Sequence, residues 1–281
     1  MNLVVEVSTT SRENGMRIRA VSFDVTGTLL VFREPVAQAY AMCAAKARVC
    51  DLPSYEELKP AFKDAWREVC EASPCFGYAE QHGGRFWWKR VVRLTLERAG
   101  KEVSDAEFER MFRKVYQYYG TPEAYDVFPE VRGCLETLNG RGLTLGVTSN
   151  TPTRTTDSTM PLLDLAKYFD WFVSSADVGR EKPAKEIFDV ALEDARFWLG
   201  DPSLQPQNML HVGDNFVADY VGARNAGFQA LYLDRPGGTI NYQDWLVGPD
   251  DANLSNVQQD TIQSLDGVLQ RIEHNHNTFS A

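Results

Sequence analysis

The stretch AVSFDVTGTLL, residues Ala20–Leu30, decides the fold of this 281-residue chain. Its apolar run, carried by Ala20, Val21 and Phe23, ends at a single acid, Asp24, and a Thr-Gly-Thr turn follows. A short apolar run bounded by turn residues is typical of a strand that is buried on both faces. Open α/β sheets bind their ligands at the carboxyl ends of such strands, so Asp24 is a candidate site residue. An ordinary strand that ends in a turn-favouring Asp would give the same local pattern.

Beyond Pro129 the sequence alternates between strand and helix patterns. The predicted strands are Leu143–Thr148, Trp171–Ser174, Met209–Val212 and Ala230–Leu233. The predicted helices are Pro129–Gly140, Leu162–Lys167, Pro183–Ala191 and Val217–Ala226. This alternation implies βαβ units and a parallel sheet, and the strand before Asp24 must join that sheet because a lone strand leaves both edges unpaired.

The segment between the first strand and residue 126 has a helical pattern and no convincing strand. Two capping boxes, Ser54 with Glu57 and Ser104 with Glu107, open predicted helices that run to about Ala72 and Gly120. The other predicted helices are Glu34–Val49 and Arg85–Ala99, with a non-helical passage at Pro74–Gly84. We therefore expect a helical insert that leaves the sheet after its first strand and returns near Phe128.

These patterns predict an α/β protein with a discontinuous core. The core is expected to span residues 16–32 and 127–250, and the helical cap residues 33–126, with an N-terminal extension at 1–15. Residues 251–281 are expected to form a C-terminal segment. In it we predict a strand near Thr261, a helix over Leu265–Ile272 and a frayed end over His274–Ala281.

Charge and hydropathy exclude several classes of partner. The net charge of −10 argues against a nucleic-acid or anionic-membrane surface, because both need a basic patch. No apolar run approaches the roughly 18 residues of a membrane span. The first fifteen residues are too short and mixed for a signal peptide, so a cytoplasmic location is expected, with a trimmed organelle presequence as the alternative. The sequence does not indicate an oligomeric state.

The five cysteines do not form a zinc pattern, because no pair has the close spacing of such sites. Cys43 and Cys50 lie seven residues apart on one predicted helix, about 10 Å along its axis, which is too far for a disulfide. We interpret the cysteines as reduced structural thiols. A redox link between Cys70 and Cys75 is the alternative.

Polar side chains follow several predicted strands at the edge where parallel strands end. They are Asp24, Ser149 with Asn150, Lys182, and Asp214 with Asp219. On neighbouring strands Asp24 and Asp214 would repel each other unless one is protonated or a cation lies between them. Mg²⁺, which prefers oxygen ligands, fits two carboxylates, a backbone carbonyl and water.

The remaining polar groups predict a site for an anion beside this pair. The Ser149 hydroxyl and nearby amides would form a neutral cradle, and Lys182 would add a compact positive charge. A metal, a lysine and a hydroxyl around an exposed carboxylate describe a site that holds a phosphoryl group beside a nucleophile. The structural alternative is that Lys182 pairs with Asp214 and merely holds two strands together.

Four segments of the sequence resemble the four ordered motifs of the haloacid dehalogenase-like (HAD) hydrolases. They are FDVTGTLL, VTSN, VGREKPAKEIF and HVGDNFVADYVGARNAGF, and they follow in the family's order over residues 20–228. The helical insert between the first two is similar to the family's first-position (C1) cap. Its FGY at 76–78 and FWWKRVV at 86–92 further resemble the eukaryotic HAD-like hydrolase domain-containing branch.

The resemblance implies a fold and a set of residue roles. The core would be a flavodoxin-like doubly wound parallel sheet, and Asp24 a nucleophile that becomes an aspartyl-phosphate. The Thr26 carbonyl and Asp214 would bind Mg²⁺ together with Asp24, and Asp219 would support these ligands. Ser149, Asn150 and Lys182 would hold the phosphoryl group. Most members are phosphatases, so the partner implied is a small phosphorylated molecule.

One position departs from the family's pattern. Its phosphatases usually carry a second Asp two residues after the nucleophile, which protonates the leaving group, and this chain has Thr26 there. A hydroxyl cannot donate a proton at neutral pH, so a factor of roughly 10²–10⁴ in rate is at stake. The family's ion-pumping ATPases also have Thr at this position, but this chain lacks a predicted membrane segment.

Three functional classes therefore remain open. The first is a Mg²⁺-dependent phosphatase, slow or restricted to good leaving groups. The second is a weakly active or inactive protein that binds phosphate or a partner, which Thr26 favours. The third is a true haloacid dehalogenase, whose chemistry needs no metal and would leave the repulsion between Asp24 and Asp214 uncompensated.

The cap offers aromatic and basic side chains as candidate substrate contacts. They are Phe76, Tyr78, His82, Trp87, Trp88, Lys89 and Arg90. Because Trp87 and Trp88 lie four residues before Val91 and Val92, helical spacing also predicts that they form the hydrophobic core of the cap.

Overall fold

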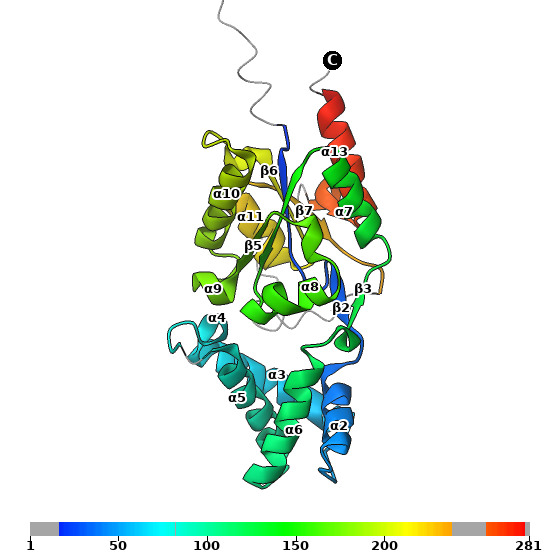
Figure 1. Cartoon of the computed structure of the whole chain (residues 1–281), viewed down its shortest axis with the longest axis vertical. Coiled ribbons are helices and arrows are strands. Elements are labelled where there is room, and N and C mark those ends of the chain that lie inside the picture. Colours follow the sequence, from blue (N-terminus) through cyan, green and yellow to red (C-terminus); the bar gives the residue numbers. More distant parts are fainter. Residues whose placement is uncertain (1–16, 82, 238–256, 279–281) are drawn as a thin grey trace, which may run out of the picture.

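The computed structural model describes residues 17–81, 83–237 and 257–278. The predicted N-terminal extension, residues 1–15, lies outside the described residues. The described chain is arranged in two tiers, with a sheet and its helices above and a group of helices below (Figure 1).

The upper tier contains a six-stranded parallel sheet. In spatial order its strands are β5 (Trp171–Ser174), β4 (Thr144–Ser149), β1 (Ala20–Phe23), β6 (Met209–Gly213), β7 (Gln229–Leu233) and β8 (Thr261–Ile262). Numbered along the chain, this order is 3-2-1-4-5-6, the arrangement of Rossmann-type sheets. The predicted doubly wound parallel sheet is confirmed, and the strand that precedes Asp24 lies at its centre.

Helices cover both faces of the sheet (Figure 1). One face carries α7 (Val131–Gly140) and α13 (Asp266–Thr278); the other carries α10 (Lys185–Leu199) and α11 (Gly222–Asn225). Shorter elements connect them: α8 (Met160–Leu162), α9 (Ser175–Val178), α12 (Val257–Asp260), the 3₁₀ turns Ala166–Tyr168 and Pro206–Asn208, and the π-helical turns Thr155–Thr159 and Phe216–Val221. Both faces of the sheet are therefore covered by helices. This explains why the sequences of its strands are nearly continuous hydrophobic runs.

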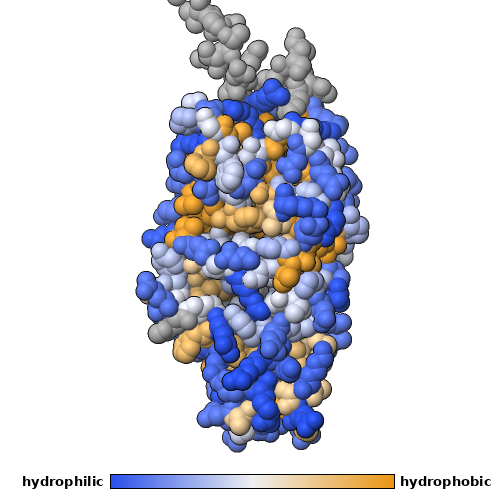
Figure 2. All heavy atoms as spheres, in the orientation of Figure 1, coloured by the Kyte–Doolittle hydropathy of each residue, from blue (hydrophilic) through white to orange (hydrophobic). Residues whose placement is uncertain are grey.

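The lower tier is formed by four longer helices and one short one. They are α2 (Val36–Lys46), α3 (Tyr55–Ala72), α4 (Pro74–Gly77), α5 (Gly84–Arg98) and α6 (Asp105–Tyr118). Both predicted capping boxes are present, since the Ser54 and Ser104 hydroxyls accept from the Glu57 and Glu107 amides while these glutamates accept in return. Figure 2 shows that the outer face over α5 and α6 is largely hydrophilic, as expected for helices whose apolar side chains pack inward.

The insert is joined to the core by a small antiparallel pair. Strand β2 (Leu30–Phe32) pairs with β3 (Tyr125–Val127), and the 3₁₀ turn Pro122–Ala124 precedes β3. The prediction that residues 33–126 contain no strand is therefore wrong at their end. The reason is that Tyr125–Val127 is a short segment whose partner lies almost a hundred residues earlier, and local periodicity does not reveal such a pair.

Four other predicted elements differ in the structure. The passage Pro74–Gly84, which was expected to be non-helical, contains the short helix α4. The helix expected at Leu162–Lys167 is divided, because Asp164 has a left-handed backbone with a φ of 56°. The helix expected at Val217–Ala226 begins as a π-helical turn. The C-terminal helix continues to Thr278, so the frayed end predicted from His274 is wrong for the part that the structure describes.

Each tier has its own hydrophobic interior. In the core, one cluster lies between the sheet and α7 with α13, and another lies between the sheet and α10 with α11. A third cluster lies among the insert helices and includes Tyr40, Leu58, Val92 and Phe112. Aromatic side chains of this third cluster, among them Phe62, Trp66 and Phe76, line a cavity at the carboxyl edge of the sheet, where the candidate site lies.

Candidate active site

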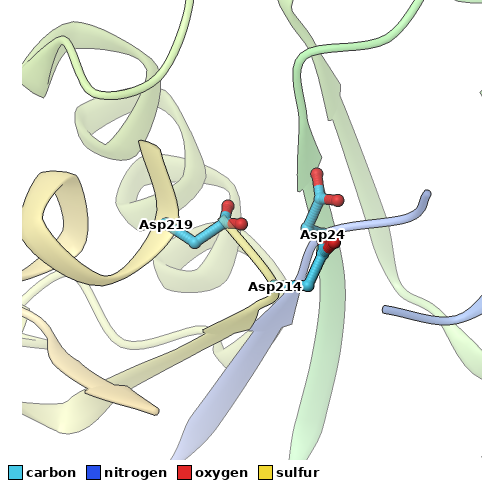
Figure 3. A group of neighbouring side chains, drawn as sticks. All are labelled: Asp24, Asp214 and Asp219. Carbon is cyan, nitrogen blue, oxygen red and sulfur yellow. The ribbon is translucent and has the colours of Figure 1, made fainter. Parts of the chain in front are cut away.

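The strand order places two acids at the point where the sheet changes direction. Asp24 follows β1 and Asp214 follows β6, and these parallel strands are direct neighbours at the centre of the sheet. From β1 the chain proceeds to β4 on one side and later returns to β6 on the other, which opens a crevice at their carboxyl ends. Figure 3 shows the carboxylates of Asp24 and Asp214 side by side in this crevice.

A third carboxylate points toward this pair from the turn after β6 (Figure 3). One oxygen atom from each of Asp24, Asp214 and Asp219 lies within 4.8 Å of the other two, and all three residues are buried. The second oxygen of Asp219 accepts from the Asn215 amide at 2.9 Å, which fixes the turn against the end of the strand. The three acids predicted for this edge are therefore brought together.

Lys182 reaches the carboxylates from the loop before α10. Its ammonium donates to Asp24 Oδ1 at 2.7 Å, to Asp219 Oδ1 at 2.5 Å and to the Thr148 carbonyl at 2.8 Å. The side chain is fully buried. The structural alternative named Asp214 as the partner of Lys182, whereas among the described residues the structure gives Lys182 ion pairs with Asp24 and Asp219.

The pKa shifts follow from this burial and charge. Burial raises the pKa of Asp24 above its usual range, although Lys182 opposes the shift. Burial would likewise raise the pKa of Asp219, but Lys182 and His211 hold it well below its ordinary value. Burial would lower the pKa of Lys182, and the two carboxylates raise it instead, so the ammonium stays charged.

The end of β4 supplies Ser149 and Asn150. Ser149 is buried, and its hydrogen bond to Asp24 acts to lower the pKa of that carboxyl. The Asn150 side chain donates to the Lys182 carbonyl at 2.9 Å and accepts from the Lys182 amide at 2.7 Å. Asn150 thus fixes the backbone that carries the lysine, a contact that the sequence did not indicate.

A buried polar chain behind the carboxylates was also missed by the sequence analysis. His211 Nε2 lies 3.1 Å from Asp219 Oδ1, and Nδ1 lies 3.0 Å from the Ser22 hydroxyl. Ser22 in turn lies 2.8 Å from the Thr148 hydroxyl across the sheet. Burial lowers the pKa of His211, so the ring is neutral and one nitrogen can donate to Asp219. The sequence did contain a signal for this chain. Ser22 and His211 are polar residues within two otherwise apolar strands, β1 and β6, and they face each other in the sheet.

The turn after Asp24 is held by Arg235, which the sequence analysis also missed. Its guanidinium donates to the Gly27 and Thr28 carbonyls at 3.2 and 2.9 Å, pairs with Glu130 at 2.7 Å and lies over the Phe128 ring. Gly27 has a φ of 90°, and a Cβ atom there would come within 2.0 Å of Asp214 Oδ2. Only glycine leaves the room that this carboxylate occupies.

The acids fit a divalent cation. They offer oxygen ligands in a buried cluster that gathers three carboxyl groups around one ammonium. Asp24 and Asp214 are the residues that could hold the ion. Asp219 is placed behind them, because its two oxygens already accept from Lys182, His211 and Asn215.

A cavity extends from Asp24 toward the insert helices. It has a volume of about 120 Å³ and includes Thr26, which is half-buried beside the carboxylate. Of the predicted cap contacts, Phe76 and Trp88 line this cavity. The Trp87 ring is buried instead and donates to the Ser73 carbonyl at 2.7 Å, as predicted for the cap core.

The other predicted cap contacts do not line this cavity. Tyr78 lies against Gly179 of the core, Lys89 pairs with Glu109, and Arg90 is exposed. His82 lies outside the described residues. Of the predicted substrate contacts, Phe76 and Trp88 therefore line this cavity, and Phe76 and Trp87 line a neighbouring one together with Lys182.

The cysteines, all of which are described, are free thiols. Burial and the nearby Glu181 raise the pKa of Cys75 to about 12, and burial also raises the pKa of Cys70. Protonated thiols are poor nucleophiles, so the structure supports the prediction of reduced structural cysteines.

A doubly wound parallel sheet, with acids at its switch point and a helical insert above them, defines the class of capped α/β hydrolases. The chain belongs to the haloacid dehalogenase-like hydrolases, because the family model of that description matches residues 18–227. The predicted family is thus confirmed by most of the chain.

Curated eukaryotic relatives match most of their own length. Haloacid dehalogenase-like hydrolase domain-containing protein 3 of Xenopus laevis is 32% identical over 254 residues, which cover 90% of this chain and 98% of the relative. The human protein of the same name is also 32% identical, over 79% of this chain and 84% of its own. The predicted similarity to this eukaryotic branch is confirmed.

Solved structures of the family share the fold at low sequence identity. The HAD-hydrolase YfnB of Bacillus subtilis, bound to magnesium, has a TM-score of 0.65 at 18% identity, covering 92% of this chain and 99% of its own. A HAD phosphatase of Thermococcus onnurineus has a TM-score of 0.55 at 22% identity, covering 91% and 98%. The L-2-haloacid dehalogenase RSc1362 gives 0.60 at 21%, covering 92% and 99%. Within the described residues, no helix combines the length and apolar character that a membrane crossing requires.

Proposed function

We propose that the protein is a Mg²⁺-dependent phosphatase that acts on a small phosphorylated molecule through an aspartyl-phosphate at Asp24. The observation that carries this proposal is the buried cluster of Asp24, Asp214 and Asp219 with Lys182 at the switch point of the sheet. A site that only held strands together would not need three buried acids so close to one another, one of them lining a cavity.

Asp24 would act as the nucleophile. Its oxygen attacks phosphorus, the bond from phosphorus to the leaving oxygen breaks, and that oxygen takes a proton from solvent. Water then attacks the phosphorus, the bond to Asp24 breaks, and inorganic phosphate leaves. Lys182 is placed to neutralise the oxygens of the transferring group, and the Ser149 hydroxyl can donate to them.

Magnesium would be held by Asp24, Asp214 and the Thr26 carbonyl, and it would stabilise negative charge on the phosphoryl oxygens. Asp219 would keep Lys182 in place, because its carboxylate accepts from the ammonium while His211 holds the same oxygen. Thr26 leaves the nucleophile without the usual neighbouring acid. We therefore propose that turnover favours leaving groups that depart without a proton.

Phosphate release from acetyl phosphate tests this proposal. Its leaving group is a weak base, and the molecule is small enough to reach Asp24 without filling the cavity. We expect turnover with Mg²⁺ and a loss of at least about 10²-fold in excess EDTA or in Asp24→Asn. Retention of more than about a tenth of the activity in Asp24→Asn would remove Asp24 as the nucleophile.

Thr26 also favours a second candidate, a weakly active or inactive protein that binds phosphate or a partner. Failure to release phosphate from acetyl phosphate, in a folded protein that binds inorganic phosphate with Mg²⁺, would support it. A haloacid dehalogenase is the third candidate, and release of halide from a 2-haloacid in EDTA would support that one. The pair of Asp24 and Asp214 argues against it, because two buried carboxylates on neighbouring strands favour a cation between them and dehalogenase chemistry needs none.

A further inference from the structure

Aromatic side chains are the largest group in the lining of the cavity above Asp24. Ten of the side chains that line it are Phe, Tyr or Trp, and they come from both the insert and the core. The centre of the Trp88 ring lies 5.2 Å from that of Trp66 and 6.3 Å from that of Phe76, so these rings form one continuous wall. A flat apolar group placed between them would gain ring contacts on more than one side.

The same cavity holds little charge. Among the described residues that line it, the charged side chains are Asp24 and Arg154. The Arg154 guanidinium donates to the Tyr116 carbonyl at 2.7 Å and lies 4.0 Å from the centre of the Tyr116 ring. Arg154 is thus already engaged with α6, which leaves no ready cation for a second phosphate or a carboxylate on the substrate.

The free energy of burying the leaving group then distinguishes sugar and glycerol phosphates from aryl phosphates. The several hydroxyls of a sugar or glycerol would each need a partner among the Thr and Tyr hydroxyls of the lining, and burial without one is unfavourable. An aromatic ring has no such requirement and gains free energy when it leaves water. The volume of about 120 Å³ is close to that of an engineered cavity of about 150 Å³ that accepts benzene, so a single ring is a suitable size.

The position of Thr26 points to the same class independently. Among the described residues that line the cavity, Asp24 is the one with a carboxyl group, so none of the others could protonate a leaving oxygen. A phenol has a pKa of about 10, as in Tyr, whereas an alkoxide is nearly as basic as hydroxide, whose conjugate acid has a pKa of about 15.7. A phenolate can therefore leave without the missing proton donor.

We propose that this protein acts on small aryl phosphates, in which one aromatic ring carries the phosphate and fills the cavity between Asp24 and the Trp88 wall. This inference rests on the proposed phosphatase function for the reaction and on the cavity for the ring. The ligand is a small molecule, because the cavity lies between the core and the insert helices and most of its aromatic side chains are buried or half-buried.

Binding of phosphonates, which are not hydrolysed, tests the cavity without relying on turnover. With Mg²⁺ present, we expect calorimetry to give phenylphosphonate at least about tenfold tighter binding than methylphosphonate, because only the former buries a ring. Equal affinity, or no binding of either, would overturn the proposal. Selective binding without turnover of acetyl phosphate would contradict the phosphatase function and leave the cavity assignment intact.

Measurements of turnover then test whether the protein prefers a substrate with an aromatic ring, and whether that ring belongs to a small molecule or to a peptide. We expect phenyl phosphate to exceed glycerol phosphate in kcat/KM by at least about 10²-fold, because it differs in both the ring and the leaving group. A preference for glycerol phosphate would overturn the proposal. Equal kcat/KM for a phosphotyrosyl peptide and phenyl phosphate would overturn the assignment to small molecules.

Two matched variants of α5 test whether the ring of the substrate binds against Trp88. Trp88→Leu should raise KM for phenyl phosphate several-fold more than it raises KM for acetyl phosphate, because acetyl phosphate has no ring to contact the aromatic wall. Phe86→Leu removes a ring of the same helix that is 58% exposed and outside the cavity, and it should change neither substrate. Unchanged KM for phenyl phosphate in a folded Trp88→Leu protein would contradict the placement of the ring. If that variant does not fold, the phosphonate series on the unmodified protein decides.

Discussion

At the scale of single residues, the site is organised by one lysine shared between two acids. Lys182 binds both Asp24 and Asp219, but only for Asp219 do the neighbouring donors outweigh burial and keep the pKa low. The pKa of Asp24 is raised by burial, so ionisation of the proposed nucleophile is less favourable than in water. A divalent cation at Asp24 and Asp214 would supply positive charge and prepare the nucleophile at the same time.

Thr26→Asp tests whether a missing proton donor limits turnover. We expect the variant to raise kcat/KM for benzyl phosphate, which leaves as an alkoxide, by about tenfold or more relative to p-nitrophenyl phosphate. Both substrates carry a ring, so the comparison isolates the leaving group. The added negative charge near Asp24 will offset part of the gain.

The control is Thr26→Asn, which changes the side chain at this position without adding an acid. Mutant-to-wild-type ratios that are equal for the two substrates would show that Thr26 does not occupy an empty general-acid position. The same conclusion would follow from a loss that is confined to benzyl phosphate.

His211 should make the stability of the fold depend on pH. In the folded state burial lowers the pKa of His211, whereas in the unfolded chain a His takes up a proton near pH 6.5. The unfolded state therefore binds more protons below that pH, and this contribution to stability is present above pH 6.5 and lost as the pH falls. His211→Gln retains a donor for Asp219 and does not titrate.

We expect the melting temperature of His211→Gln to fall less between pH 7 and pH 5 than that of the wild-type protein. His274→Gln, a change on the exposed surface of α13, should retain the wild-type slope. Identical slopes for all three proteins would show that His211 is not held neutral in the folded state.

At the scale of elements, α4 is the contact between the insert and the loop that carries Lys182. The Cys75 amide donates to Glu181 Oε1 at 3.0 Å, and a Cβ atom on Gly179 would come within 2.5 Å of the Tyr78 ring. Cys75 and Phe76 have left-handed backbones with φ values of 53° and 57°, which few side chains adopt without support. The core contact thus stabilises the turn that brings Phe76 into the cavity.

Glu181→Gln tests this contact, because burial raises the pKa of Glu181 above its ordinary value. The folded state holds this proton more tightly than the unfolded chain, so ionisation lowers stability as the pH rises above about 4.5. A Gln carbonyl accepts from Cys75 without ionising. We expect Glu181→Gln to be as stable as wild type or more so at pH 7, and Glu181→Ala to lose about 1 kcal/mol.

Thermal unfolding at pH 5 and pH 7 would measure both variants. A Gln variant that is destabilised as much as the Ala variant would show that the charge of Glu181, and not its acceptor oxygen, supports the turn at Cys75.

Elements with a strong local pattern could be predicted from the sequence, and elements made by distant pairing could not. The capping boxes at Ser54 and Ser104 and the buried strands were recognisable because their signals lie within a few residues. The β2–β3 pair and the Arg235 clamp join segments about a hundred and two hundred residues apart. For the same reason the site acids could be placed at one sheet edge, but the sharing of Lys182 between Asp24 and Asp219 could not.

At the scale of the whole molecule, we propose that the core and the cap are separate structural units that share the active site. The insert has its own hydrophobic cluster, and the β2–β3 pair connects it to the sheet. The phosphoryl chemistry would then belong to the core, and the choice of leaving group to the aromatic wall of the cap. The cavity between them contains residues of both units.

The central claim is that a phosphoryl group passes through Asp24, and trapping that intermediate tests it most directly. The protein would be mixed with acetyl phosphate and Mg²⁺, quenched in acid during turnover and digested for mass spectrometry. We predict that the peptide containing Asp24 gains the mass of one phosphoryl group, and that the gain is absent in EDTA and in Asp24→Asn. Steady release of phosphate with no phosphoryl group on that peptide, and with activity retained in Asp24→Asn, would contradict the account.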